Sequence, residues 1–205
     1  MKKEEAIKIM TKCAKDYHTY LENKNLLFLF GSKENPYFFE AVFLPRHFLH
    51  LTGAQISKNR ISGSSEFYKK ALKNQLSPND FSLTSNGTTE MKLSVLPQLM
   101  KIYRSAKMVG DYNFTKSVLY TEKLVGNITA SLGFVRDNRY YIPNTALKED
   151  IRDITTKPQS RILAILKKSK NESYYEEICY KAKGILLQDI SIPQTLSNKI
   201  HIEGI

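Results

Sequence analysis

Hydrophobic and polar residues follow two different periods along the chain, and the first is helical. Between residues 3 and 21, apolar side chains recur at spacings of three and four from Ile7 to Leu21. This period predicts an amphipathic helix with one face turned to a core.

The period changes after residue 25. Two short apolar runs, residues 26–30 and 37–44, flank a turn rich in Gly, Asn and Pro, which predicts an antiparallel hairpin. Pro45 ends the second run and can start a helix, because its fixed φ suits the first turn. We expect a short helix over residues 46–51, stopped at Gly53.

The middle of the chain is predicted to be helical. A polar loop over residues 57–65 leads into a second helix whose serines can cap its start. Residues 88–109 repeat apolar side chains helically from Met91 to Ile102, and Pro97 should kink or divide this helix.

The second half is predicted to be mainly β. Residues 117–126, 127–137 and 139–144 are rich in aromatic and branched side chains, with a tight turn at Asp137-Asn138. Residues 145–153 predict a brief helix capped by Asn144 or Thr145. Two further runs, 161–169 and 173–182, predict a second hairpin.

The order of these elements indicates one α+β domain over residues 1–205, in which N-terminal helices pack on a mostly antiparallel β-sheet. The chain is long enough to bury roughly 70% of the surface that its unfolded form exposes. The two cysteines, Cys13 and Cys179, are far apart and have no CxxC or histidine spacing. We therefore expect two buried free thiols and no zinc or disulfide site.

Charge suggests a class of partner. The formal net charge is +11 and the pI is about 9.5, and a positive surface attracts polyphosphates. The lysines are scattered, so a merely solvated basic surface is the alternative. A signal peptide and a membrane span are both absent from the sequence, so we expect a cytoplasmic protein with no membrane partner.

Several common active-site motifs are missing. The sequence has no GxxxxGK[ST] phosphate loop, no GxGxxG dinucleotide fingerprint and no GxSxG nucleophile elbow. These absences weigh against ATPases, dehydrogenases and α/β-hydrolases.

The segment PRHFLHLTG, residues 45–53, carries the first concentration of reactive groups. His47 and His50 are three residues apart and fall on about the same helical face. No HExxH spacing accompanies them, so we expect no metal site. An imidazole suits proton transfer near neutral pH, while the alternative is that His50 is only a packed helix residue.

The second concentration spans residues 123–153. Gly126 and Gly133 lie in β context, where a missing side chain suggests a bulge or a closely approached backbone. Lys148, Asp150 and Arg152 follow in the predicted capped turn. These cations could grip phosphate, or they could be an ordinary charged surface.

Taken together, HFLHLTG, EFYKKAL, LYTEKLVGNITASLGF and YYIPNTALKEDIRD resemble the phage-associated Barnase-EndoU-colicin-RelE-like (BECR-fold) nucleases, specifically their fourth subgroup. The resemblance covers residues from about 26 to 183. It implies a BECR-like α+β ribonuclease of a prophage or mobile element, with a toxin-like or phage-defence role and a possible cognate antitoxin or immunity protein. It also implies metal-independent cleavage of RNA, in which the ribose 2′-OH attacks the adjacent phosphate and leaves a cyclic phosphate.

This chemistry needs a base, an acid and cations for the phosphorane charge. As a hypothesis, His50 transfers the proton, Thr52 hydrogen-bonds the phosphate or sugar, and Lys148 and Arg152 stabilise the transition state. No cofactor is expected. The further candidates for contact with RNA are His47, Tyr68, Lys123, Asn127, Thr145 and Asp150.

Two other functions stay open. A short histidine motif also occurs in ADP-ribosyltransferases, and Glu176 or Glu177 could supply their late catalytic glutamate. A non-enzymatic prophage protein could instead bind RNA or a partner protein through its basic face and its tyrosines, which stack on bases but also fill cores.

Overall fold

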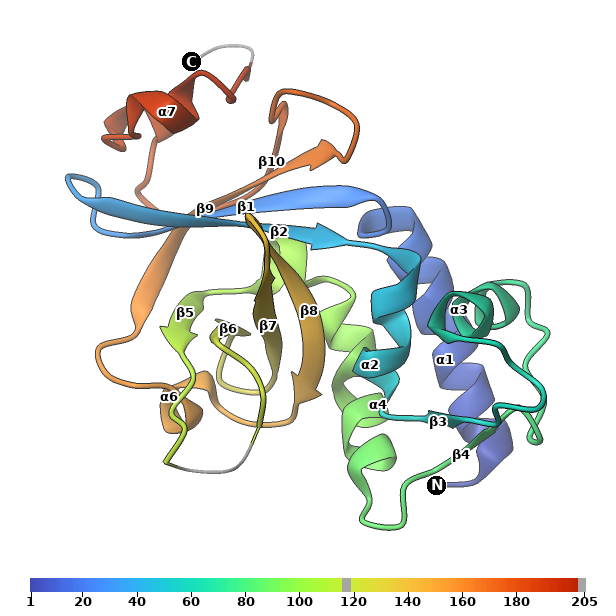
Figure 1. Ribbon diagram of the computed structural model, residues 1–205. Helices are drawn as coiled ribbons and strands as arrows, with labels where there is room; N and C mark the ends of the chain where they lie inside the picture. Colours follow the sequence, from blue (N-terminus) through green and yellow to red (C-terminus); the bar gives the residue numbers. More distant parts are fainter. Residues whose placement is uncertain (116–118, 203–205) are drawn as a thin grey trace.

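The helices of the first half of the chain gather on one side of the molecule, and most of the strands lie on the other side together with the short helices of the second half (Figure 1). The computed structural model describes residues 1–115 and 119–202. Both sides share one continuous apolar cluster, which runs from the first helix to the strands of the second half. No helix in these two ranges is both long and apolar enough to cross a lipid bilayer.

The helical side is built mostly from the first half of the chain, and the predicted N-terminal helix is confirmed. Its elements are α1 (Lys3–Tyr20), the 3₁₀ turn η1 (Pro45–His47), α2 (Phe48–Thr52), α3 (Ser64–Leu72), α4 (Thr88–Leu99) and α5 (Ile102–Ser105). A small two-stranded sheet of β3 (Gln55–Ile56) and β4 (Phe81–Ser82) accompanies them. Further along the chain lie α6 (Ile151–Ile154), η2 (Leu187–Asp189) and α7 (Gln194–Ser197).

The main sheet takes its strands from both halves of the chain. They are β1 (Lys24–Gly31), β2 (Pro36–Phe43), β5 (Met108–Asp111), β6 (Lys123–Gly126), β7 (Ser131–Asp137), β8 (Tyr140–Leu147), β9 (Ser160–Ser169) and β10 (Glu177–Lys181). Their order is β1-β2-β8-β7-β6-β5-β9-β10, and β1 also pairs with β9. The pairings therefore close a ring, with β10 attached to β9. Both predicted hairpins, β1–β2 and β9–β10, are confirmed.

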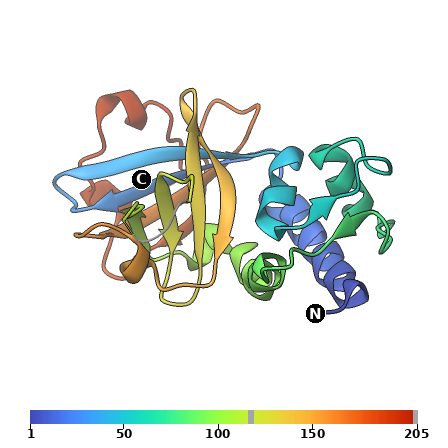
Figure 2. The same ribbon diagram turned by 60° about the horizontal axis from the view of Figure 1, so that its bottom comes forward.

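Aromatic side chains fill the space between the β1–β2 hairpin and the β7–β8 hairpin, which cross each other. Phe28 of β1 stacks on Phe39 of β2 with ring centroids 4.9 Å apart, and Phe134 of β7 meets Phe28 edge to face at 6.2 Å. Figure 2 shows the β7–β8 hairpin crossing in front of β1 and β2. Packed edges and faces of this kind hold the hairpins in one relative orientation.

One strand pairing differs from the rest. Strands β2 and β8 run parallel and are paired only through Ala41 and Tyr141, whereas the other pairings are antiparallel. Beyond this bridge the two strands separate. The next elements after β2 in the chain are η1 and α2, and both pack against β8 in this opening.

The expected helix over residues 145–153 is wrong in most of its length. Thr145, Ala146 and Leu147 continue β8, where they pair with the first residues of β7. The helix starts only at Ile151, and Asp150 caps it by accepting a hydrogen bond from the Arg152 backbone N–H at 2.9 Å. Cross-strand pairing therefore outweighs the local helical preference of this segment.

Other boundaries also differ from the expectations. Met108 and Val109 belong to β5 rather than to the end of a helix, because they pair with β6 and β9. The strand expected over residues 117–126 is confirmed from Lys123, while residues 116–118 lie outside the described residues. The N-cap of α3 is Gly63, with no serine side chain capping it. Cys13 is buried, as expected, but Cys179 is only partly buried.

The predicted division of this helix is confirmed, but it falls after Pro97 and not at it. Helix α4 continues through Pro97 to Leu99, and α5 begins at Ile102. Proline removes the backbone donor that would bond to the carbonyl of Leu93, so Pro97 weakens the turn before it and does not by itself produce the break after Leu99.

The expected close approach at Gly133 is confirmed. A Cβ at this position would lie 2.6 Å from both Thr121 Oγ1 and Thr145 Cγ2, and the β7–β8 register shifts between Gly133 and Phe134. Only glycine leaves room for these two threonines.

Replacement of Gly133 by Ala should therefore lower the free energy of unfolding by about 1–3 kcal/mol through overpacking. Gly63→Ala is the matched control, because a Cβ there would meet nothing within 4 Å. Urea unfolding of both variants measures the effect, and equal stabilities would contradict the close approach at Gly133.

Candidate functional site

A hollow of about 470 Å³ opens where β2 and β8 separate. The segment after β2 lines it with Arg46, His47 and His50, and β8 lines it with Asn144 and Thr145. We call it the histidine hollow. It combines groups that lie about a hundred residues apart in the chain.

Local chemistry explains why the histidines reach this place. Pro45 starts the 3₁₀ turn directly after the strand, and the Leu44 backbone N–H donates a hydrogen bond to His47 Nδ1 at 3.2 Å. Gly53 ends α2 in the left-handed region with φ +69°, a conformation that suits glycine. The short helix between these two points carries His50.

His50 is the exposed histidine of the pair. Partial burial of its ring, together with the nearby charge of Lys92, lowers its pKa below the usual 6.5. The Lys92 ammonium donates a hydrogen bond to the His50 backbone carbonyl at 2.9 Å. His50 is thus a neutral imidazole at pH 7, able to accept a proton.

Lys92 comes from α4 and also lines the histidine hollow. Partial burial lowers its pKa from 10.5 to about 8. The lysine is therefore mostly charged at pH 7 and still close enough to neutrality to give up its proton. A neutral imidazole and a lysine of this kind form a base and an acid side by side.

His47 is almost fully buried. Burial, followed by the charges of Arg46 and His50, lowers its pKa from 6.5 to about 4, while a backbone hydrogen bond with Val42 acts in the opposite direction. Its ring is neutral at pH 7 and holds the turn by accepting the hydrogen bond from Leu44. His47 therefore positions the segment that carries His50.

The remaining lining groups include Arg46, Tyr120, Asn144 and Thr145. Asn144 Nδ2 donates to the Tyr120 carbonyl, and its Oδ1 accepts a hydrogen bond from Thr121 at 3.2 Å. The Thr145 hydroxyl is buried and has no hydrogen-bond partner within residues 1–115 and 119–202. Arginine, lysine and free hydroxyl groups suit a phosphate or a sugar.

Thr52 is close to His50 in the sequence, but its side chain does not line the histidine hollow. Its side chain is fully buried, its Oγ1 donates to the Leu49 carbonyl at 2.8 Å, and it accepts from the Ala54 N–H at 3.1 Å. These bonds close the end of α2. The Thr52 hydroxyl is thereby occupied with the backbone.

Lys148 and Arg152 are exposed and do not line the histidine hollow. Two nitrogens of the Arg152 guanidinium bind the Asp150 carboxylate, Nε at 3.0 Å and Nη2 at 2.6 Å. This hydrogen bonding lowers the pKa of the Asp150 carboxyl. Helix α6 packs through Ile151 and Ile154 against the side of the ring formed by β5 and β6.

The other expected RNA contacts are spread over the molecule. Thr145 lines the histidine hollow beside His47. Tyr68 is buried and donates to Glu22 at 2.8 Å, and Asn127 accepts hydrogen bonds within its own turn from the backbone N–H and hydroxyl of Thr129. Lys123 pairs with Asp111 and lines a different hollow.

Sequence reasoning missed Lys92 and Asn144 as site residues. Lys92 is one of many lysines, and the apolar repeat of α4 says only that it is on the outer part of a helix. Asn144 was expected to cap a helix and instead belongs to β8. Arg46 directly precedes His47 in the sequence. This nearness to the two histidines was the one sequence signal that Arg46 would line the same hollow.

Within the part of the chain that the structure describes, no three His, Cys, Asp or Glu side chains are grouped so that they could hold a metal ion. The charged side chains of the histidine hollow are Arg46 and Lys92. Any developing negative charge there would be met by these two cations.

The fold and the hollow define a basic α+β protein with a neutral imidazole beside a lysine and an arginine, an arrangement suited to phosphodiesters. The family model described as phage-Barnase-EndoU-ColicinE5/D-RelE like nuclease 4 matches residues 9–184. The chain belongs to this nuclease family, as its sequence resemblance indicated, and the match begins earlier than residue 26, within α1. No curated protein and no solved structure matches it.

The lowered pKa of His47 predicts a loss of stability in acid. Because its pKa is about 4 in the folded chain and about 6.5 when unfolded, the unfolded chain takes up the proton first as the pH falls. The free energy of unfolding should drop by up to about 3 kcal/mol between these two pH values. This part of the drop should vanish in His47→Gln.

Chemical unfolding at a series of pH values measures this difference. His201→Gln, which changes an exposed histidine near the C-terminus, serves as the control and should keep the wild-type slope. An unchanged slope in His47→Gln would show that another group takes up the proton.

Proposed function

We propose that this nuclease is a metal-independent endoribonuclease that cleaves RNA by attack of the ribose 2′-OH on the adjacent phosphate. The observation that carries the proposal is the placement of His50 and Lys92 in one basic hollow, where the lowered pKa of His50 keeps its ring neutral at pH 7 and the pKa of Lys92 is lowered to about 8. Groups with pKa values near the working pH are efficient in proton transfer.

His50 is the proposed base. Its exposed neutral imidazole takes the proton of the 2′-OH, and the 2′-oxygen forms a new bond to phosphorus. The lowered pKa keeps the ring unprotonated at pH 7. Its neighbour His47 cannot take this role as well, because it is buried and its ring is engaged with Leu44.

Lys92 is the proposed acid. As the bond from phosphorus to the 5′-oxygen breaks, the Lys92 ammonium gives its proton to that oxygen. Before the transfer, its positive charge stabilises the negative phosphorane. The products are a 2′,3′-cyclic phosphate and a free 5′-hydroxyl.

Arg46 and Thr145 are proposed to hold the substrate. The Arg46 guanidinium, at the rim of the hollow, binds a phosphate oxygen in the charge-assisted manner usual for arginine. Thr145 offers its unpartnered hydroxyl to a sugar or phosphate oxygen. Binding at two points would place the scissile phosphate between His50 and Lys92.

The ADP-ribosyltransferase alternative has less support. Neither Glu176 nor Glu177 lines the histidine hollow, and Glu177, in β10, pairs with Lys167 at 2.9 Å. Family membership favours a nuclease. A non-enzymatic RNA-binding protein is the outcome to expect if RNA is bound through the hollow and recovered uncut.

We further propose a toxin-like role in a prophage or mobile element, with cytosolic RNA as the substrate and a cognate antitoxin or immunity protein as the partner. A family named after phage-associated nucleases supports this setting. Growth arrest on expression of the wild type, absent for an inactive His50 variant, would be the corresponding test.

Replacement of His50 by Gln should lower kcat/KM for RNA at least about 100-fold, since a positioned base typically contributes this much or more. The thermal midpoint should change little, because the side chain is exposed. Cleavage of a labelled oligoribonucleotide in EDTA measures the rate, and His201→Gln is the matched control.

The substrate provides a second control for this prediction. An oligonucleotide with 2′-deoxyribose at each position lacks the attacking hydroxyl and should not be cut. Cleavage of the DNA form, a requirement for added metal, or a 5′-phosphate on the product would each reject the mechanism.

The two pKa values predict a bell-shaped pH dependence of kcat/KM. The rate should rise with pH as His50 loses its proton below 6.5, and should fall above about 8 as Lys92 becomes neutral. Lys92→Arg stays charged at alkaline pH, so the alkaline fall near 8 should disappear while the rate drops.

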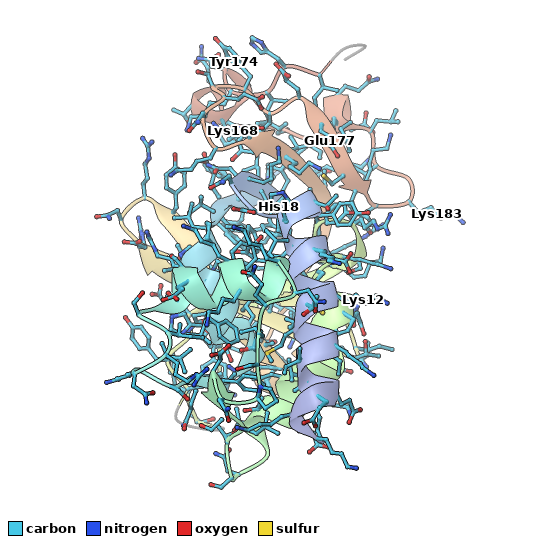
Figure 3. The ribbon with its side chains drawn as sticks, turned by 90° about the vertical axis from the view of Figure 1, so that its right-hand side faces the viewer. Lys12, His18, Lys168, Tyr174, Glu177 and Lys183 are labelled. Atoms are coloured by element: carbon cyan, nitrogen blue, oxygen red, sulfur yellow. The ribbon has the colours of Figure 1, made fainter. Side chains whose placement is uncertain are left out.

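Lys12→Arg is the matched control for this profile. Lys12 is an exposed helical lysine of α1 on the face shown in Figure 3, and it does not line the histidine hollow. Its variant should keep the full bell. An alkaline limb unchanged in Lys92→Arg would remove Lys92 from the acid role.

A further inference from the structure

A second basic hollow of about 340 Å³ lies at the start of β8, away from the histidines. Strand β2 lines it with Phe38 and Glu40, the β7–β8 turn with Arg139, and the first residue of β8 with the Tyr140 side chain. We call it the distal hollow. Nothing in the proposed cleavage step uses it.

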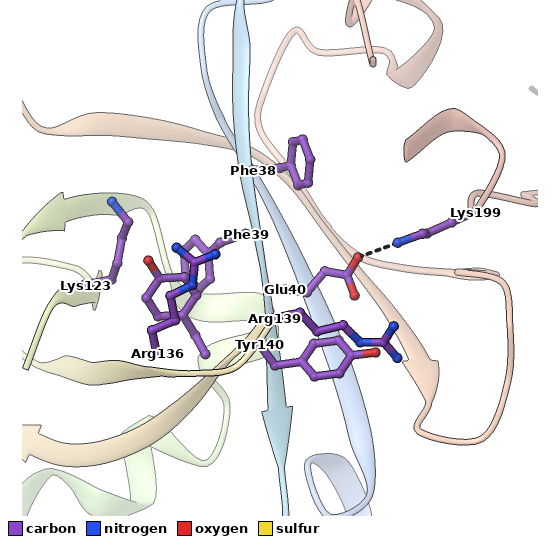
Figure 4. A pocket seen from close by; sticks show the side chains of 9 residues that line it. Phe38, Phe39, Glu40, Lys123, Arg136, Arg139, Tyr140 and Lys199 are labelled. Carbon is purple, nitrogen blue, oxygen red and sulfur yellow. Dashed lines mark hydrogen bonds and ion pairs between the residues drawn. The ribbon is translucent and has the colours of Figure 1, made fainter. Parts of the chain in front are cut away.

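Positive charge dominates the distal hollow. Lys123, Arg136, Arg139 and Lys199 line it together with the single carboxylate of Glu40. Lys199 binds that carboxylate at 3.2 Å and so neutralises it (Figure 4). Arg136 extends from β7, where its Nε donates to the Asn138 carbonyl at 3.2 Å, and Arg139 extends from the turn after it. The remaining nitrogens of the two guanidinium groups can donate to an anion.

Flat aromatic surfaces accompany this charge. Phe38 is 41% exposed although it is a large apolar side chain in a strand. The Arg139 guanidinium lies over the Tyr140 ring with 4.8 Å between its Cζ and the ring centroid. Exposed rings beside arginines are the combination on which unpaired bases stack.

A chain of hollows connects this place to the histidines. An intermediate hollow of about 450 Å³ shares Arg139 and Tyr140 with the distal hollow, and it shares Arg46 with the histidine hollow. Lys170 lines the intermediate hollow as a further cation. Asp137 also lines it, and its carboxylate lies 3.8 Å from the Arg46 guanidinium. The three hollows are therefore neighbours along one surface.

Strand β8 runs beneath this surface in the same order. Tyr140 and Tyr141 line the distal hollow, and residues 142–145 line the histidine hollow. Five residues of strand span roughly 17 Å. A substrate that fills only the histidine hollow leaves the distal hollow empty.

We propose that the distal hollow is a second nucleotide-binding site, which holds a base and phosphate of single-stranded RNA several nucleotides away from the cleaved bond. This inference rests on the proposed function, because it names the form of the substrate that the histidine hollow cuts. Phosphates of the RNA bind Arg46, Arg136 and Arg139, and a base stacks on Phe38 or Tyr140.

Single-stranded RNA fits better than a duplex. Bases can stack on protein rings only when they are not already stacked in a helix, and sequence-tolerant binding of this kind uses a basic groove with aromatic platforms. The distal hollow offers both in a small space. A duplex would keep its bases away from Phe38 and contact the arginines alone.

Two exposed side chains make the test possible without disturbing the core. Arg139→Ala removes a cation and Phe38→Ala removes a ring. The matched controls are Arg104→Ala, whose guanidinium likewise lies over its neighbour Tyr103 at 5.5 Å, and Tyr174→Ala, a ring that is also 41% exposed. Tyr174 is labelled on the face in Figure 3, near the C-terminal part of the chain.

The first measurement is binding, in a His50→Gln background that does not cut. A fluorescent single-stranded oligoribonucleotide of about twelve nucleotides is long enough to reach both hollows. Phe38→Ala should raise its Kd at least about five-fold, the lower end of the value of one base stack. Arg139→Ala should reduce the slope of log Kd against log salt by about 0.7, and neither control variant should change Kd.

The second measurement is cleavage by the otherwise unmodified protein. Phe38→Ala and Arg139→Ala should raise KM for the long oligonucleotide and leave kcat/KM for dinucleoside monophosphates unchanged, because a dinucleotide does not reach the distal hollow. Equal loss on both substrates would overturn the inference, since the two residues would then act on the histidine hollow or on folding. No loss on either substrate would overturn it as well.

The two proposals can fail separately. If the wild type cuts no RNA but binds the oligonucleotide in a manner that depends on Phe38 and Arg139, the distal site stands and the nuclease mechanism is rejected. If cleavage depends on His50 while binding is indifferent to Phe38 and Arg139, the mechanism stands and the distal site is rejected.

Discussion

The separation of β2 and β8 beyond the bridge between Ala41 and Tyr141 is the constraint on which the functional surface depends. A fully paired edge would place the two strands about 4.8 Å apart and leave no space between them. Since they pair at one point only, the segment after β2 packs in the opening, and α2 carries His50 to the edge of β8. The ring of strands keeps this opening fixed, because the pairing of β1 with β9 closes the ring on its far side.

Burial within this opening sets the chemistry. The same partial removal from water lowers the pKa of His50 and that of Lys92, because it disfavours the charged form of each base. Neighbouring positive charge lowers the histidine further. At neutral pH a neutral imidazole and a charged lysine whose pKa is near 8 thus line one hollow, one able to take a proton and the other able to give one. The proposed cleavage uses the neutral imidazole of His50 as the base and the charged ammonium of Lys92 as the acid.

Much of the fold follows from local patterns. The amphipathic period over residues 3–21, the apolar hairpin after it and the glycines of β6 and β7 all predicted the elements that the structure has. The exceptions are segments whose state depends on distant partners. Residues 145–147 join β8 because β7 pairs with them, and Met108 joins β5 because β6 and β9 flank it. No local preference contains that information.

By itself, the sequence determined the positive charge of the chain, the short helix that holds His47 and His50 near each other, and the likeness to a nuclease family. Only the tertiary structure decided which cations face His50. Lys92 reaches it from α4, forty-two positions further along the chain, whereas Lys148 and Arg152 do not line the histidine hollow. The physical reason is that an exposed lysine looks the same in sequence wherever it lies, and its partner is chosen by the packing of helices and strands that are remote in the chain.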